Sequence, residues 1–267
     1  MRKLGHALRL GVGVDSLALV ETRRWGGEAS LLAELPLDTA LALPAAIAAG
    51  AAQLFDTAKR DRSPLTVVLA DELARLWQVT PPAGCSRMAD LEAAAALRFQ
   101  QLYGEPAASW QLSANWQLGA PFLAAALPRS LLAALQQASH AHAMRLVEVV
   151  PQFIALCNRW HARVDDGDWF GVAHDGVLSL GVCEGGGIST LRAIAIGPQA
   201  NSGWLADHLA REALRLGTTA PQRLRLCGAV PPAWWSVPGC VRLDEQVQAH
   251  EHGLSAAALL ALSGSAA

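Results

Sequence analysis

A glycine-marked segment near the N-terminus carries the residue types that could cradle a nucleotide phosphate. It comprises residues 10–21, with the sequence LGVGVDSLALVE. Gly11 and Gly13 permit close backbone approach and positive φ, while the surrounding valines and leucines favour a pleated strand. The segment therefore predicts two strands joined by a tight turn that contains Asp15 and Ser16. Backbone amides in such a turn can face phosphate oxygens, and a carboxylate beside them can hold hydrated magnesium.

Two histidine pairs and a group of aspartates could instead bind a metal ion. The pairs are His140 with His142 and His250 with His252. Spacing i, i+2 puts both rings on one face of a strand, but both pairs fall at the ends of predicted elements, which favours exposed turns. The aspartates are Asp165, Asp166 and Asp168. They lack the closing glutamate of a calcium loop, so we favour a linker between lobes and predict no metal site.

A glycine-rich run at residues 184–187 (EGGG) could be taken for a phosphate loop. No lysine and hydroxyl residue follow it, and the next segment has the pattern of a strand rather than a helix. The run therefore favours a plain hairpin turn. Ser16 has no recognisable histidine and aspartate partners, so serine hydrolysis is not indicated either.

Composition narrows the function further. The 267 residues are 52% hydrophobic, which is ample for one large domain or two modest lobes, and the net charge is −2. Such a balance gives no general attraction to nucleic acid or to an anionic membrane, so we expect neither as a main partner. The chain has five widely spaced cysteines: Cys85, Cys157, Cys183, Cys227 and Cys240. Without a Cys-x-x-Cys pair, they indicate free thiols of a reducing compartment.

The sequence predicts no segment that enters a membrane. Its richest apolar run, residues 40–55, is mostly alanine and is interrupted by Pro44, Gly50 and Gln53. That run is too short and too weakly apolar to span a bilayer. The basic start of the chain is not followed by a continuous apolar stretch, so no signal peptide is predicted. We therefore expect a soluble protein located in the cytoplasm.

Hydrophobic periodicity predicts an α/β chain whose opening occurs twice. The first half is expected to form strands at 8–14, 17–24, 30–35 and 65–70, with a helix at 44–58. The second half is expected to form strands at 169–173, 177–182, 189–194 and 223–227, with a helix at 204–216. Between the halves we expect a helix at 88–103, strands at 108–117 and 121–127, a helix from 128 and a strand at 144–150. A bridging helix at 153–160, a strand at 241–243 and a terminal helix at 253–262 complete the prediction.

Three segments in order resemble one family, the actin-like PilM proteins of type IV pilus biogenesis, with the related cytoplasmic part of GspL in type II secretion. The first is the hairpin of residues 10–21. The second and most specific is FLAAALPR at 122–129, followed by a helix, a strand at 146–150 and PQFIAL at 151–156. The third is LRLCGA at 224–229, which is similar to the strand-to-glycine motif beside adenosine.

This resemblance implies an α/β, two-lobed actin-like (ribonuclease H-like) ATPase fold with a small α+β insert in the first lobe. It places the first lobe at 1–84 and 151–164, the inserted subdomain at 85–150 and the second lobe at 165–267. It also places a nucleotide cleft at Gly11, Gly13, Asp15, Ser16, Gly176 and Gly228.

The departures from the family pattern bear on activity. Gly13 stands where the family has its magnesium-holding aspartate, and Asp15 stands where it has a second glycine. Of the Asp-apolar-Gly phosphate motif in the second lobe only Gly176 is matched, and the Gly-Gly pair of the adenosine loop is reduced to Gly228 with an alanine. Asp15 would also repel a phosphate. We therefore expect a degenerate cleft, a pseudo-ATPase that hydrolyses no ATP and has no cofactor beyond weak ATP binding.

For function, the resemblance implies an adaptor. PilM proteins bind the short cytoplasmic tail of a bitopic inner-membrane protein, PilN, in a groove between the first lobe and its insert. We therefore expect a PilN-like partner, peripheral association with the inner membrane through that partner, and a docking surface between residues 36–80 and 85–150. Such docking needs shape rather than catalysis.

Two other classes of function stay open. One is an actin-like protein that still binds or hydrolyses ATP, such as a divergent sugar-kinase relative, which a thermal shift with Mg·ATP would reveal. The other is a self-associating structural protein, whether a homodimer or a filament, which sedimentation over a concentration series would reveal.

Overall fold

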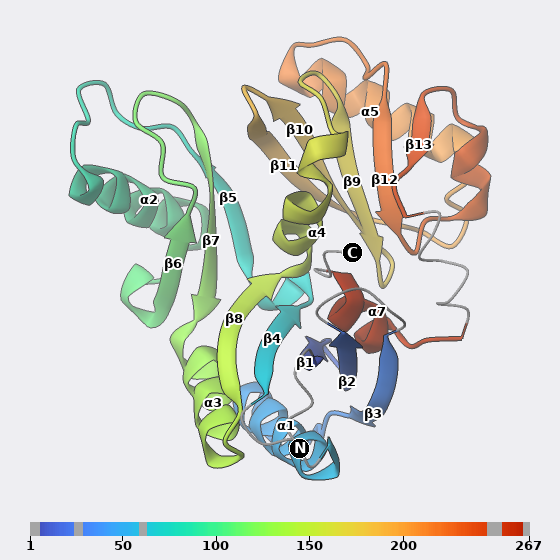
Figure 1. The fold of residues 1–267 in the computed structure, drawn as a ribbon. Helices are drawn as coiled ribbons and strands as arrows, with labels where there is room; N and C mark the ends of the chain where they lie inside the picture. Colours follow the sequence, from blue (N-terminus) through green and yellow to red (C-terminus); the bar gives the residue numbers. More distant parts are fainter. Residues whose placement is uncertain (1–5, 24–28, 59–62, 245–252, 264–267) are drawn as a thin grey trace.

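The structure is a computed structural model that describes residues 6–23, 29–58, 63–244 and 253–263. Within these ranges the chain forms three β-sheets with helices packed on their faces (Figure 1). None of the helices in these ranges is long and apolar enough to cross a membrane. The histidine pair at His250 and His252 lies outside the described residues.

The first sheet has the strand order β3-β2-β1-β4-β8. Its strands are β1 (His6–Val12), β2 (Ser16–Arg23), β3 (Ser30–Pro36), β4 (Pro64–Leu69) and β8 (Arg145–Pro151). Strands β1 to β3 form successive antiparallel hairpins, whereas β4 lies parallel to both β1 and β8. Strand β4, PLTVVL, is apolar on both faces because helices cover both sides of a central parallel strand.

Helices pack on both faces of the first sheet. On one face α1 (Leu43–Ala58) and α3 (Arg129–Ala141) share a core with Leu8, Leu10 and Val12 of β1. Because side chains alternate along a strand, Gly11 points to the opposite face. That face holds α7 (Ala256–Ser263), which lies between the two lobes in Figure 1 and packs on β1 and β2.

The second sheet repeats the first, with the strand order β11-β10-β9-β12-β13. Its strands are β9 (Trp169–His174), β10 (Val177–Glu184), β11 (Gly187–Ala195), β12 (Leu224–Gly228) and β13 (Cys240–Arg242). Helix α5 (Ser202–Leu216) and the 3₁₀ helix η4 (Pro232–Ser236) pack on it around the buried Trp234. The predicted twofold occurrence of three antiparallel strands, a helix and a parallel strand is confirmed.

A smaller sheet of order β5-β7-β6 forms the insert. Its strands are β5 (Arg75–Val79), β6 (Trp110–Ala114) and β7 (Phe122–Pro128), and α2 (Met88–Tyr103) covers one face (Figure 1). The 3₁₀ helix η2 (Ala107–Ser109) precedes β6. Trp77, Phe99 and Trp110 form its aromatic core, with the rings of Trp77 and Phe99 5.2 Å apart. The opposite face of this sheet is directed toward the rest of the molecule.

Short helices join the lobes. The 3₁₀ helix η1 (Asp71–Leu73) follows β4, and α4 (Gln152–Trp160) follows β8. A last 3₁₀ turn, η3 (His161–Arg163), leads toward the second sheet. Both η1 and α4 begin at the carboxyl ends of parallel strands, where residues from different strands meet.

The residue ranges of the three sheets differ from the predicted boundaries of the lobes and the insert. The insert was expected at 85–150, yet its sheet begins with β5 and ends with β7, while β8 pairs with β4 in the first sheet. The apolar strand β8 is therefore the edge of the first lobe. Residues 253–263, expected in the second lobe, include α7, which packs on the first sheet because β1 and β2 offer it small residues.

Candidate functional site

The hairpin between β1 and β2 closes on itself. The Gly13 amide donates to the carbonyl of Ser16 at 2.8 Å, and the Ser16 hydroxyl donates to the Asp15 carboxylate at 2.7 Å. Asp15 is exposed, and its own carbonyl accepts a hydrogen bond from Leu37 at 2.7 Å. The predicted turn is thus present, but Gly13 contributes no side-chain oxygen to it.

Gly11 serves close packing. A Cβ atom at this position would collide with the backbone of α7, at the carbonyl of Ala257 and the amide of Ala261. Ala18 on β2, Ala257 and Ala258 are all fully buried beside it. Gly11 therefore lets a helix lie directly on the strand, and the helix backbone occupies the space in front of this glycine.

The hairpin between β9 and β10 carries Gly176. Asp175 and Gly176 both have positive φ, 44° and 75°, as in a two-residue hairpin turn. His174 stands two residues before the glycine, where the phosphate motif has its carboxylate, and it is buried. Burial lowers the pKa of His174, although the nearby carboxylates Glu72 and Asp175 oppose this.

Gly228 ends β12 in the left-handed region, with φ of 87°, beside the strand end at Ala173. Its amide donates a 2.8 Å hydrogen bond to the carboxylate of Asp244. Asp244 is buried, which raises its pKa even though the Gly228 amide favours the charged form. One amide of the predicted adenosine loop is therefore bonded to a side chain of the protein itself.

Asp71 connects the two lobes. Its carboxylate accepts hydrogen bonds from the Phe153 amide at 2.9 Å and from the Ser179 hydroxyl on β10 at 3.1 Å. Burial of the carboxylate raises the pKa of Asp71 to about 6, against the lowering effect of these two donors. Asp71 therefore holds the start of α4 and a strand of the second lobe at one point.

Gln152 makes a second polar link at the same junction. Its side chain is only 3% exposed, and its amide nitrogen donates to the hydroxyl of Ser263 on α7 at 3.1 Å. The same nitrogen lies 3.5 Å from Nδ1 of His174. Gln152 thus joins α4, the C-terminal helix and the second-lobe hairpin inside the protein.

The aspartates and His142, one member of the first histidine pair, form structural contacts. Asp168 accepts hydrogen bonds from Arg223 at 2.8 Å and Arg225 at 2.7 Å, and Asp166 accepts one from the Gly186 amide. His142 lies 3.2 Å from a carboxylate oxygen of Asp56. Within the described part of the chain, no group of three or more histidine, cysteine or acidic residues is placed to hold a metal ion.

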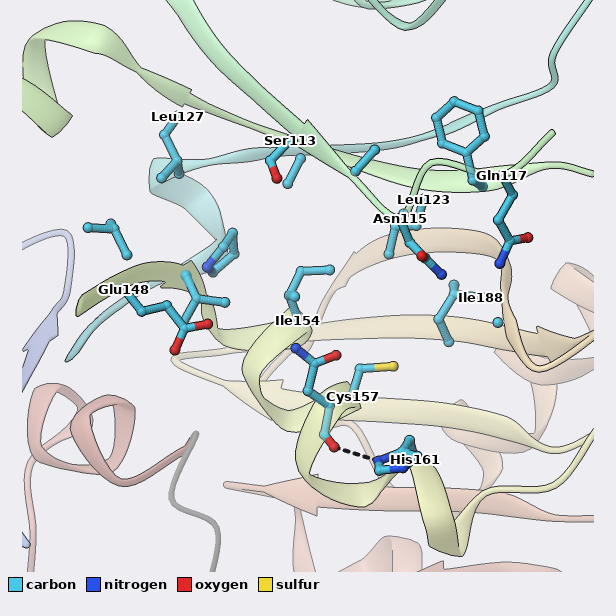
Figure 2. A pocket seen from close by; sticks show the side chains of 18 of the residues that line it. Ser113, Asn115, Gln117, Leu123, Leu127, Glu148, Ile154, Cys157, His161 and Ile188 are labelled. Atoms are coloured by element: carbon cyan, nitrogen blue, oxygen red, sulfur yellow. Dashed lines mark hydrogen bonds between the residues drawn. The ribbon is translucent and has the colours of Figure 1, made fainter. Parts of the chain in front are cut away.

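A groove of about 920 Å³ lies elsewhere, between the insert, the first lobe and the second lobe. Figure 2 shows Ser113 and Leu123 of the insert strands facing Ile154 and Cys157 of α4 across it. Strand β8 contributes Glu148 on the first-lobe side, and the β10-β11 turn contributes residues 184–189. Because β8 is an edge strand, the groove runs along an unpaired side of the first sheet.

The groove is apolar at its centre and carries negative charge. Leu123, Leu127 and Ile154 line it, and Val147 on β8 is 59% exposed. Its lining includes no lysine or arginine among the described residues, whereas Glu148 and Glu184 both contribute. Side-chain amides are also frequent in the lining: Asn115, Gln117, Gln136 and Asn158. A groove lined by apolar side chains and side-chain amides suits a peptide, which has apolar side chains and a polar backbone.

The sequence matches no known family model and no curated protein. Among solved structures, a chain of the "PilM-PilN type IV pilus biogenesis complex" is similar with a TM-score of 0.61 at 18% identity, covering 97% of this chain and 98% of that one. A Bacteroides thetaiotaomicron protein with an actin-like ATPase fold and unknown function has a TM-score of 0.58 at 13% identity, covering 85% and 84%. The fold is actin-like.

A third similar structure comes from a secretion system. The cytoplasmic domain of EpsL, an inner membrane component of the type II secretion system of Vibrio cholerae, has a TM-score of 0.54 at 12% identity, covering 90% of this chain and 86% of that one. At these identities the likeness concerns the fold. The predicted two-lobed actin-like architecture is confirmed.

The predicted nucleotide residues fall on two separate sheets of this actin-like fold. Gly11, Gly13, Asp15 and Ser16 belong to the first sheet or its turn, and Gly176 and Gly228 to the second. Of the six, none lines the groove. The residues present fit Mg·ATP poorly, because Gly13 and His174 supply no carboxylate, α7 covers Gly11, and Asp244 takes the Gly228 amide.

Sequence reasoning missed the polar residues of the lobe junction and one side of the groove. Asp71 had a usable signal, since it comes directly after a buried parallel strand. The docking surface between 36–80 and 85–150 stays a prediction, and the described residues that line the groove include none of 36–80. Its first-lobe side is formed by β8 and α4, since β8 rather than β4 is the sheet edge.

Proposed function

We propose that this chain is a catalytically inactive actin-like adaptor of a type IV pilus or type II secretion-like assembly. In this proposal the groove beside β8 docks the cytoplasmic tail of a bitopic inner-membrane protein, as a PilN-like partner. The adaptor is then cytoplasmic and reaches the inner membrane through its partner. The observation that carries the proposal is this groove in a fold similar to that of a PilM-PilN complex.

The lobe junction supports the inactive half of the proposal. Hydrolysis of ATP needs a positioned cation and amides free to face phosphates. In this chain the Gly228 amide is bonded to Asp244, and Gly11 packs on α7. Gln152 and Asp71 are bonded to residues of the protein rather than directed to an open cleft.

The groove supports the docking half. Its exposed Val147 and half-buried Leu123 are apolar surface that a partner would remove from water. The side chains of Asn115, Gln117 and Gln136 form no hydrogen bond with any described residue, so they are available to a partner. A peptide needs these two features together, because its backbone stays polar while its side chains are buried.

Site-directed photocrosslinking tests the proposal. A photoreactive amino acid replaces Val147 in the groove, and the adaptor is irradiated in cells of its native bacterium before membranes are isolated. We expect a crosslink to the cytoplasmic tail of a bitopic inner-membrane protein. Leu214 on α5 provides the control, because it is 82% exposed and lies outside the groove lining.

A crosslink from both positions to the same protein would indicate general proximity and contradict docking in the groove. A crosslink from Val147 only to a second copy of this chain would favour self-association instead. Steady ATP turnover by the purified chain would overturn the inactive half independently.

A further inference from the structure

The charge of the groove is one-sided and comes from both lobes. Glu148 lies on β8 of the first lobe, and Glu184 ends β10 in the second. Both are exposed, and no lysine or arginine of the described chain lines the groove with them. Arg129 follows the insert strand β7, and its guanidinium donates to Gln111 at 2.8 Å and to the Ala108 carbonyl.

The two carboxylates differ in how much of their charge is available. Burial and the nearby Arg159 lower the pKa of Arg9, and Glu148 lies close enough to oppose this lowering, so part of the Glu148 charge is already offset. Glu184 forms no ion pair with a described residue. Glu184 should therefore attract an incoming positive charge more strongly than Glu148 does.

The polar side chains of the groove indicate the conformation of what it holds. A helix satisfies its own backbone and has no use for the unpartnered amides of Asn115, Gln117 and Gln136. An extended segment fits better, because it leaves backbone donors and acceptors for these side chains.

We propose that the groove selects an extended peptide segment that combines apolar residues with lysine or arginine, with Glu184 and Glu148 as the residues that select the positive charge. This inference rests on the proposed docking function and specifies its partner. Leu123, Leu127 and Ile154 take the apolar side chains, and the side-chain amides take the backbone. The cation approaches the turn between β10 and β11, where Glu184 stands (Figure 2 shows the neighbouring Ile188 at that end).

A random decapeptide library displayed on phage tests this directly on the purified full chain. The library is selected in parallel on the unaltered protein, on Ser113→Trp, on Glu184→Gln and on Glu92→Gln. Ser113 points into the groove in Figure 2, so tryptophan there blocks it. Glu92 is an exposed acid on α2 outside the lining, and its substitution is the matched control for loss of one charge.

We expect enriched peptides that contain lysine or arginine among apolar residues, and we expect the enrichment to disappear in Ser113→Trp. In Glu184→Gln the preference for lysine and arginine should weaken, while Glu92→Gln should match the unaltered protein. For one enriched peptide measured by fluorescence anisotropy, Glu184→Gln should weaken binding about three-fold and Glu148→Gln by less. Both losses should shrink in high salt.

The outcomes separate the inference from the docking function. Peptides that depend on the groove but are neutral or acidic would overturn the charge selection and leave docking intact. Peptides with helical periodicity would overturn the extended conformation. Enrichment that is unchanged in Ser113→Trp, or no enrichment at all, would overturn docking of peptides in this groove. Gln136→Trp, which blocks the same groove from α3, replaces Ser113→Trp if that variant does not fold.

Discussion

The lobe junction and the groove both combine apolar walls with polar side chains, yet they differ in how those side chains are satisfied. At the junction Asp71, the Gln152 amide nitrogen and the Gly228 amide are bonded to other parts of the protein, whereas the buried Gln152 Oε1 and Asp244 Oδ1 have no partner among the described residues. In the groove the side chains of Asn115 and Gln136 form no such bonds with the part of the chain that the structure describes. A buried polar group stabilises a fold only when it is paired, whereas an unpaired one at the surface is available to a partner. The junction should therefore carry stability, and the groove should carry binding.

Substitution of Gly11 should have the largest effect on stability. We expect Gly11→Ala to lower the free energy of unfolding by about 3 kcal/mol, because the added methyl group must displace the backbone of α7. Urea denaturation followed by circular dichroism measures this. Gly203→Ala is the control, since its Cβ meets only the Asn201 side chain at ordinary distance. Equal stability of the two variants would refute the packing role of Gly11.

The second largest effect should be the pH-dependent contribution of Asp71 to the free energy of unfolding. Its pKa is raised by burial from 3.8 to about 6, so the folded state binds the proton more tightly than the unfolded state. Asp71 therefore contributes stability below about pH 4 that is lost as the pH rises through 6, by about 2 to 3 kcal/mol.

The difference in unfolding free energy between the unaltered chain and Asp71→Asn isolates this contribution. We expect that difference to change with pH between 4 and 7 and to be constant above it. The subtraction also removes the effect of His174, whose lowered pKa acts in the opposite direction. A difference that does not vary with pH would mean that the carboxylate is as well solvated as in the unfolded chain.

A substitution in the groove should leave stability almost unchanged. For Val147→Ser we expect the unfolding free energy to stay within about 0.5 kcal/mol, because the side chain is 59% exposed. Binding of a groove-selected peptide should nevertheless weaken, as apolar contact area is lost. A large loss of stability with intact binding would reverse the contrast between the two regions.

The addition of nucleotide should have the smallest effect on the stability of the protein. A ligand that binds only the folded state raises the melting temperature, so we expect no measurable shift with millimolar Mg·ATP. Differential scanning fluorimetry tests this, with a phage-selected groove peptide as the positive control. A rise of several degrees with Mg·ATP would show that the cleft still functions and would reopen the interpretation as an ATPase.

Local patterns were sufficient for most of the fold. Alternating and continuous apolar runs predicted the strands of both lobes, and the Asp175-Gly176 pair predicted its hairpin. Sheet membership could not be predicted in the same way, because the pattern of β8 suits an insert edge and a first-lobe edge equally. Strand pairing depends on tertiary contacts that a single segment does not encode.

The candidate site was less accessible from sequence. Gly11 has the residue type of a phosphate loop, and only its contact with residues some 250 positions away reveals a packing role. The groove has no motif at all, since it arises where the edge of one sheet, the face of another and a hairpin turn come together. Residues such as Val147 and Glu184 can be recognised as groove residues only once the fold has brought these elements together.

The packing of α7 on β1 also has a consequence for folding during synthesis. Strand β1 keeps one face uncovered until α7 has been translated and has left the ribosome, because only then can the helix reach it. Nascent chains stalled before that point should expose the Gly11 face to chaperones and proteases. Chains that stop before α7 should therefore be recognised by the loss of a contact that joins two segments far apart in the sequence.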